Sequence, residues 1–191
     1  MNPLFSTRTL TLMSAGIAFN MVLGQLASML KLPIFLDAIG TFVVALLAGP
    51  LAALVTGVAT NLIWGVLTSP VAAAFAPVAG VIGLVAGLCA RAGGFRTLPR
   101  VLLSALLVTV AVVVVATPIR AYLFGGATGS GADFFVAYLN AVGSKLIESV
   151  ALTVFGVNLA DKVVSALLAW TLVRALPARL TATFPAAAAV R

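Results

Sequence analysis

Polar side chains that could bind a small molecule occur inside the long apolar segments of this 191-residue chain. Amide, hydroxyl and charged groups at membrane depth must face protein, water or a ligand, because lipid offers them no hydrogen bonds. Most of these groups fall in the outer half of their segment, and the inner halves are nearly bare. This asymmetry predicts a pocket that opens outward. Its candidate residues are Asn20, Gln25, Asp37, Thr41, Asn61, Trp64, Arg120, Tyr138, Lys145, Glu148 and Asp161.

The alternative for such side chains is a position at the membrane interface, where Trp, Tyr and snorkelling Lys are common. This alternative suits Tyr122, Asn158 and Lys162, which lie near the ends of their segments. It suits Asn20 and Asn61 less well, because both lie in the middle of theirs. We therefore expect a pocket.

The residue types needed for catalysis or metal binding are nearly absent. The sequence has no histidine and one cysteine, Cys89, which removes the commonest general base and any thiolate cluster. It also has no Gly-rich phosphate loop ending in Lys-Ser or Lys-Thr, and no two carboxylates one helical turn apart. We expect a binding protein rather than an enzyme, with no cofactor and no metal.

The segments that carry the polar groups are predicted membrane spans. Of all residues 63% are hydrophobic and 8% charged, whereas a soluble domain carries about 25% charged residues. We expect an all-α integral membrane protein in contact with lipid, with one transmembrane domain over residues 1–191 and six transmembrane helices. The spans cover about 9–30, 35–48, 51–69, 71–90, 101–123 and 158–176.

Residues 125–157 form an extracellular or interfacial segment between the last two spans. The part from Phe134 to Val157 is apolar enough to cross, but Lys145 and Glu148 lie in its middle. A charge at the bilayer centre costs about 3 kcal/mol on insertion scales. We therefore expect an additional broken or interfacial helix before the last span; a seventh span is the alternative.

The charges favour six spans. With six, one side carries seven arginines and no acidic residue, so the positive-inside rule predicts that both termini are cytoplasmic. We expect the membrane to be that of a bacterial cell. All four acidic residues then lie outside, balanced by four basic ones, and the net charge of +7 calls for no nucleic-acid partner. The inner arginines are Arg8, Arg91, Arg96, Arg100, Arg174, Arg179 and Arg191.

Small residues recur at helical spacing in two spans. Ala53, Gly57, Asn61 and Gly65 are four residues apart, which predicts a ridge for close helix packing with Asn61 facing the bundle. In the first span, Ser14 and Ala18 form a second such pair. It serves either ordinary packing or docking of another membrane protein.

Two stretches carry a family resemblance. Leu32–Thr41 (LPIFLDAIGT), followed by Ala48–Ala53 (AGPLAA) and by Thr60-Asn61-Leu62, resembles the substrate-binding S components of energy-coupling-factor (ECF) transporters. The last span, from Asp161 through Pro177, is similar to the final helix of that group. The chain length, six spans and basic cytoplasmic ends fit the resemblance over the whole chain.

The resemblance implies a six-helix subunit that binds a vitamin or other micronutrient from outside and joins a coupling membrane subunit and two ATPase subunits. It implies a docking surface of small residues on the first helix, matched by Ser14, Ala15 and Ala18, with serine in place of one expected alanine. The balanced outer charges predict a small neutral or zwitterionic vitamin or precursor. The alternatives are a membrane sensory or structural module and a self-contained small-solute transporter.

Overall fold

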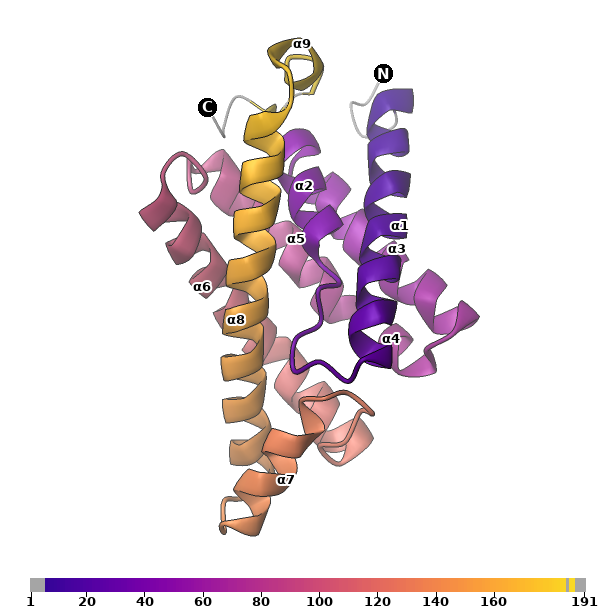
Figure 1. Cartoon of the computed structure of the whole chain (residues 1–191), viewed down its shortest axis with the longest axis vertical. Coiled ribbons are helices and arrows are strands. Elements are labelled where there is room, and N and C mark those ends of the chain that lie inside the picture. Colours follow the sequence, from indigo (N-terminus) through magenta and orange to yellow (C-terminus); the bar gives the residue numbers. More distant parts are fainter. Residues whose placement is uncertain (1–5, 185, 188–191) are drawn as a thin grey trace.

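The computed structural model describes residues 6–184 and 186–187, and all regular structure in these ranges is helical (Figure 1). One short element, η2, is a π-helical turn that continues α6. The elements are α1 (Thr7–Met29), α2 (Ile39–Ala48), α3 (Pro50–Leu67), α4 (Pro70–Ala74), α5 (Ala76–Arg91), α6 (Leu98–Pro118), η2 (Ile119–Leu123), α7 (Asp133–Ala141), α8 (Leu146–Ala175) and α9 (Ala178–Thr181).

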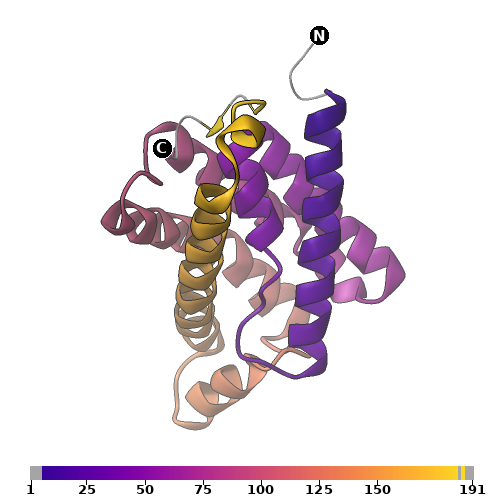
Figure 2. The same cartoon turned by 45° about the horizontal axis from the view of Figure 1, so that its top comes forward.

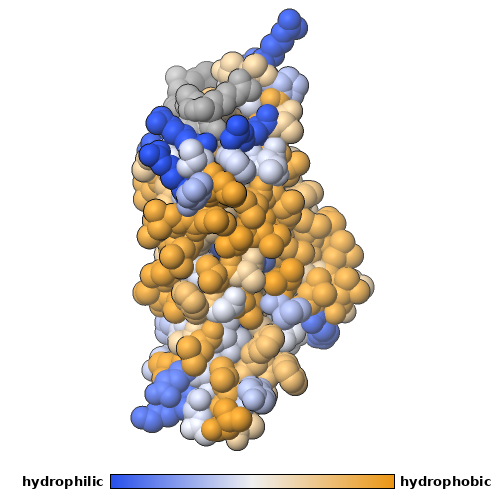
Figure 3. All heavy atoms as spheres, turned by 60° about the vertical axis from the view of Figure 1, so that its left-hand side comes forward, coloured by the Kyte–Doolittle hydropathy of each residue, from blue (hydrophilic) through white to orange (hydrophobic). Residues whose placement is uncertain are grey.

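Four helices are long and apolar enough to cross a membrane, namely α1, α3, α6 with η2, and α8. Their outer faces expose large apolar side chains, such as Val66 and Val114. Figure 3 shows a hydrophobic band across one face of the molecule, with hydrophilic groups gathered at both ends. These features indicate a multi-pass membrane protein and confirm the all-α prediction. The count of six spans is not established, because α2 and α5 are shorter apolar helices.

Helix α2 lies at the centre of the bundle and packs against α1, α3, α5 and α8. Eight of its ten residues are buried, and Phe42, Val44 and Ala45 are fully so. The helix meets α1 at backbone distance, since a Cβ at Gly40 would collide with the backbone of Gly16. Ten residues at about 1.5 Å each give α2 a length of about 15 Å.

Glycines allow α3 and α5 to cross at backbone distance. A Cβ at Gly57 would collide with the carbonyl of Ala79, and one at Gly83 with the carbonyl of Ala53. On the same side of α3, a Cβ at Gly65 would collide with Ala73 of α4. The predicted small-residue ridge therefore forms the contact of α3 with α4 and α5.

Two predicted spans differ from the observed helices at their boundaries. The span predicted over 35–48 becomes helical only at Ile39, and the preceding connection, residues 30–38, is irregular. The span predicted over 71–90 is broken at Phe75. Pro77 explains the break, because a proline has no N–H to continue the preceding helix but suits the first turn of a new one.

The last predicted span, 158–176, is part of a longer helix, because α8 runs unbroken from Leu146 to Ala175. The expected additional helix is the short α7, which packs on α8. Lys145 and Glu148 are exposed at the start of α8, where the Lys145 N–H donates to Glu148 Oε2 at 3.4 Å. Thirty residues span about 45 Å, against about 30 Å of hydrocarbon. The two charges therefore need not lie at the bilayer centre.

The molecule has two distinct ends. The first turn of α1, the α5–α6 connection, the last turn of α8 and α9 lie together at one end, and α7 lies at the other (Figure 1). We call the first end the arginine end, because it carries Arg8, Arg91, Arg96, Arg100, Arg174 and Arg179. Arg191, which is predicted to lie on the same side, is outside the described residues.

In both ribbon views the 30–38 connection lies between α1 and α8, in the half of the molecule nearer α7 (Figures 1 and 2).

Candidate functional site

A cavity of about 150 Å³ lies within the bundle near the α7 end, between α1, α3, α5, α6 and α8. Two irregular segments also contribute to its wall, the 30–38 connection and the loop around 128–131. Its wall is mainly apolar, with Phe35, Trp64 and Phe75 as its aromatic residues. An apolar wall with a few polar groups is typical of a small-molecule site.

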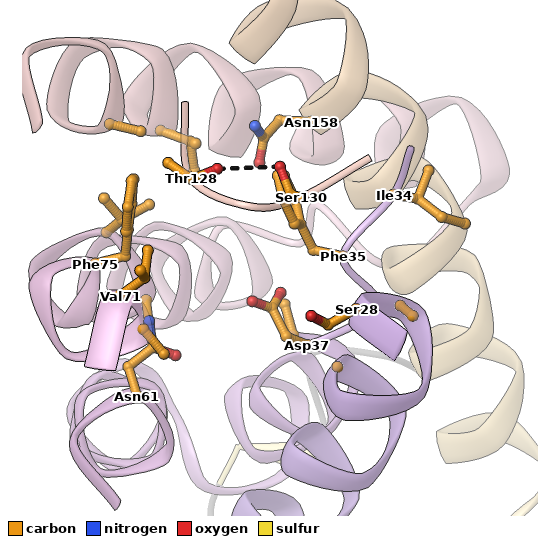
Figure 4. Close-up of a pocket in the computed structure, with 18 of the residues that line it drawn as sticks. Ser28, Ile34, Phe35, Asp37, Asn61, Val71, Phe75, Thr128, Ser130 and Asn158 are labelled. Atoms are coloured by element: carbon orange, nitrogen blue, oxygen red, sulfur yellow. Dashed lines mark hydrogen bonds between the residues drawn. The ribbon is translucent and has the colours of Figure 1, made fainter. Parts of the chain in front are cut away.

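Five of the predicted site residues line this cavity: Asp37, Thr41, Asn61, Trp64 and Arg120. They come from the 30–38 connection, α2, α3 and η2, so the fold brings together groups far apart in the sequence. Figure 4 shows Asp37 and Asn61 projecting into the same space from different elements.

The Asp37 carboxylate belongs to a buried charged cluster. Its Oδ1 lies 4.0 Å from Nζ of Lys162, and that same Nζ pairs closely with Oδ2 of Asp161. Asp161 does not line the cavity. Its Oδ1 accepts the N–H groups of Phe35 at 3.1 Å and Leu36 at 2.7 Å, so it holds the 30–38 connection against α8.

The Asn61 side chain is 5% exposed and lines the cavity from α3. Its Oδ1 has no hydrogen-bond partner among the residues that the structure describes. A buried acceptor without a partner costs about 1–3 kcal/mol. This cost is removed if a bound molecule donates a hydrogen bond to it.

Asn20 is fully buried but does not line the cavity. Its Nδ2 donates to Thr41 at 2.8 Å and to Thr60 at 3.2 Å, and its Oδ1 accepts the Gly40 N–H at 2.7 Å. These bonds join α1, α2 and α3 and fix the position of Thr41, so we assign Asn20 a positioning role.

Gln25 also supports the cavity wall rather than entering it. Its Oε1 accepts hydrogen bonds from Trp64 Nε1 at 2.9 Å and from Thr68 at 3.1 Å. The Trp64 ring packs closely on Gly24, where a Cβ would lie 2.8 Å from the ring. Gln25 and Gly24 together set the orientation of the indole in the wall.

Arg120 lines the cavity and holds its outer loop. Its Nη2 lies 2.6 Å from Asp133 Oδ1, and its Nε donates to the Gly126 carbonyl at 2.9 Å. Asp133 also accepts the N–H groups of Thr128 and Gly129. The loop is tied in turn to the 30–38 side of the cavity by Lys31.

That tie combines a side-chain hydrogen bond with a close backbone approach. Lys31 Nζ donates to the Gly129 carbonyl at 2.7 Å, and a Cβ at Gly131 would collide with the Lys31 carbonyl. The two irregular segments therefore meet over the cavity without space for a larger side chain between them.

Other predicted residues lie elsewhere. Tyr138, Lys145 and Glu148 are exposed on α7 and at the start of α8, and the structure does not bring them to the cavity. On α1, the predicted docking residues Ser14, Ala15 and Ala18 are all exposed.

Sequence reasoning missed two polar groups of the cavity on α8. Lys162 and Asn158 had been assigned to the membrane interface, yet Lys162 is 1% exposed and both line the cavity. Val154, Asn158 and Lys162 are spaced four residues apart and so share one helix face, a signal that was available in the sequence. The other cavity residues outside the prediction include Ser28, Phe35, Ser69, Phe75, Thr128 and Ser130.

The arrangement is suited to non-covalent binding. Within the described residues, no three His, Cys, Asp or Glu side chains come close enough to hold a metal ion. Comparison with protein-family models, with curated proteins and with solved structures finds no match to this chain. The function must therefore be inferred from the cavity and its surroundings.

Proposed function

We propose that this chain is the S component of an ECF-type importer, which binds a small vitamin-like micronutrient from outside and delivers it across the membrane. The observation that carries the proposal is the cavity near the α7 end, where Asn61 Oδ1 has no partner among the described residues. A ligand bound in this cavity would donate a hydrogen bond to this acceptor.

The distribution of arginines supports the orientation that this function requires. Six described arginines lie at the arginine end, and the cavity lies toward the other end. By the positive-inside rule the arginine end faces the cytoplasm. We therefore propose a bacterial cell membrane protein with both termini inside, six crossings that include α2 and α5, and a cavity on the outer side.

Ligand binding is the first test of this function. We expect one member of a broad vitamin panel to raise the melting temperature of the purified protein in detergent, since a ligand at 100 times its Kd adds about 2.7 kcal/mol of stability. Asn61→Leu and Asp37→Ala should weaken binding of this ligand at least about fivefold, because each removes a polar partner worth about 1–3 kcal/mol. Melting curves at increasing ligand concentration give the affinities.

Tyr138→Phe is the matched control for these variants, since Tyr138 is 59% exposed and outside the cavity. It should bind the ligand as the unmodified protein does. If no member of the panel stabilises the protein, or if both cavity variants bind as tightly as the control, the proposed site is wrong.

Docking to the coupling subunit is the second test. Ala15 and Ala18 lie on the exposed face of α1, where small side chains permit close helix contact. We expect Ala15→Trp with Ala18→Trp to abolish co-purification with coexpressed coupling and ATPase subunits, while the ligand-dependent melting shift stays unchanged.

Val114→Trp on α6, at a residue 70% exposed, is the control that places a tryptophan on another exposed apolar surface. It should leave co-purification intact. Equal loss of assembly in both variants would remove α1 as the docking surface. Ligand uptake into liposomes by this chain alone would instead favour a self-contained transporter.

A further inference from the structure

The cavity offers two acceptor groups whose bonding capacity is not used. Asn61 Oδ1 has no hydrogen-bond partner among the described residues, and it lies on a side chain 5% exposed. Asp37 Oδ1 has Lys162 Nζ as its ion-pair partner, at 4.0 Å, which is beyond hydrogen-bond distance. In Figure 4 both side chains project into the cavity.

The two cationic side chains of the cavity already have closer partners. Lys162 Nζ is in close contact with Asp161, and Arg120 lies 2.6 Å from Asp133. Asp161 and Asp133 do not line the cavity, and they neutralise the two lining cations, Lys162 and Arg120. Asp37, 23% exposed, is the carboxylate that lines the cavity, and neither cation lies within hydrogen-bond distance of it. An incoming molecule therefore meets a carboxylate and an amide oxygen that can both accept hydrogen bonds.

We propose that the ligand carries a cationic nitrogen with at least two N–H donors, such as an amidinium, an ammonium or a protonated aminoheterocycle. One N–H pairs with the Asp37 carboxylate and another donates to Asn61 Oδ1. This inference rests on the proposed function, because it names the chemical class of the molecule bound in the same cavity. It replaces the expectation of a neutral or zwitterionic ligand with that of a molecule that carries a positive group.

The rest of the cavity limits the body of the ligand. A cavity of about 150 Å³ accommodates a molecule built around a single aromatic ring. Phe35, Trp64 and Phe75 supply apolar wall surface for such a ring. The ligand is therefore a compact ring or similar body with a charged nitrogen at one edge.

Benzamidine, benzamide and benzoate test the charge preference directly, because they share one shape and carry charges of +1, 0 and −1 near neutral pH. Each is titrated at up to millimolar concentration against the purified protein, and the melting temperature is recorded. We expect benzamidine to bind about tenfold more tightly than benzamide, and benzoate to bind most weakly.

Asp37→Asn tests the residue that carries the preference. The substitution keeps the shape of the side chain and removes its charge, so benzamidine and benzamide should bind this variant about equally. Glu148→Gln is the matched control, since it removes one carboxylate that is exposed and outside the cavity. It should keep the full preference for benzamidine.

The results with the three probes and the vitamin panel separate this inference from the proposed function. Benzoate binding as tightly as benzamidine, or a preference unchanged in Asp37→Asn, overturns it while leaving ligand binding by the cavity supported. If none of the three probes binds, the vitamin panel is the test. A bound vitamin with a cationic nitrogen supports the inference, and a bound vitamin without one overturns the inference but not the proposed function. No binding by any probe or vitamin overturns both this inference and the proposed function.

Discussion

Lys162→Met should lower the free energy of unfolding by about 3–5 kcal/mol, the cost of leaving buried charges without a counterion. Lys162 is 1% exposed and faces two carboxylates, those of Asp161 and Asp37. Without the ammonium group, these carboxylates repel each other inside the bundle. Chemical unfolding in mixed micelles, followed by circular dichroism, measures the change.

Lys145→Met is the matched control, because it makes the same substitution on an exposed lysine at the start of the same helix. Its effect should stay within about 0.5 kcal/mol. Adding Asp161→Asn to Lys162→Met should restore part of the stability, since an asparagine can still accept the N–H groups of Phe35 and Leu36. A Lys162→Met protein as stable as the control would show that the cluster is not held by its charges.

Gly83→Ala should destabilise the protein by about 3 kcal/mol, at the upper end of overpacking effects. A Cβ at Gly83 would collide with the Ala53 carbonyl and approach the Leu54 N at 2.7 Å, so the obstacle is backbone rather than a movable side chain. Helices α3 and α5 would have to separate, and the cavity wall carried by Asn61 would move with them. The same unfolding measurement gives the size of the effect.

Gly156→Ala on α8 is the control for this variant, because a Cβ there has nothing within 4 Å. It should be neutral or stabilise by up to about 1 kcal/mol through helix propensity. Comparable losses in both variants would mean that the close crossing of α3 and α5 does not limit stability.

Features that depend on local spacing could be predicted from the sequence. The ridge of Ala53, Gly57 and Gly65 follows from the helical period alone, and it correctly placed Asn61 toward the bundle. The positions of the long helices could be predicted as well, because a run of about 20 apolar residues is also a local feature of the sequence. The start of α8 was missed because Lys145 and Glu148 were assumed to lie at bilayer depth, whereas they lie at the end of a helix longer than the hydrocarbon is thick.

The features that depend on contacts between distant segments could not be predicted. Asp37 and Lys162 are far apart in the sequence, and only the fold brings them to 4.0 Å. Lys162 and Asp161 are neighbours in the chain, and adjacent positions on a helix point in different directions, but the flexible lysine side chain reaches back to the carboxylate. The tie between Lys31 and Gly129 joins two loops whose conformations no periodic pattern fixes.

In the half of α2 nearer the arginine end, close packing should block the passage of ions. Between Thr41 at the cavity and Gly49 beside Arg91, the residues Val44, Ala45 and Leu46 are fully buried among neighbouring helices. An ion stripped of its water in such a column would have no polar partner, which is prohibitive. In the proposed orientation, the cavity can therefore stay in contact with the outer solution while the membrane keeps its potential and its proton gradient.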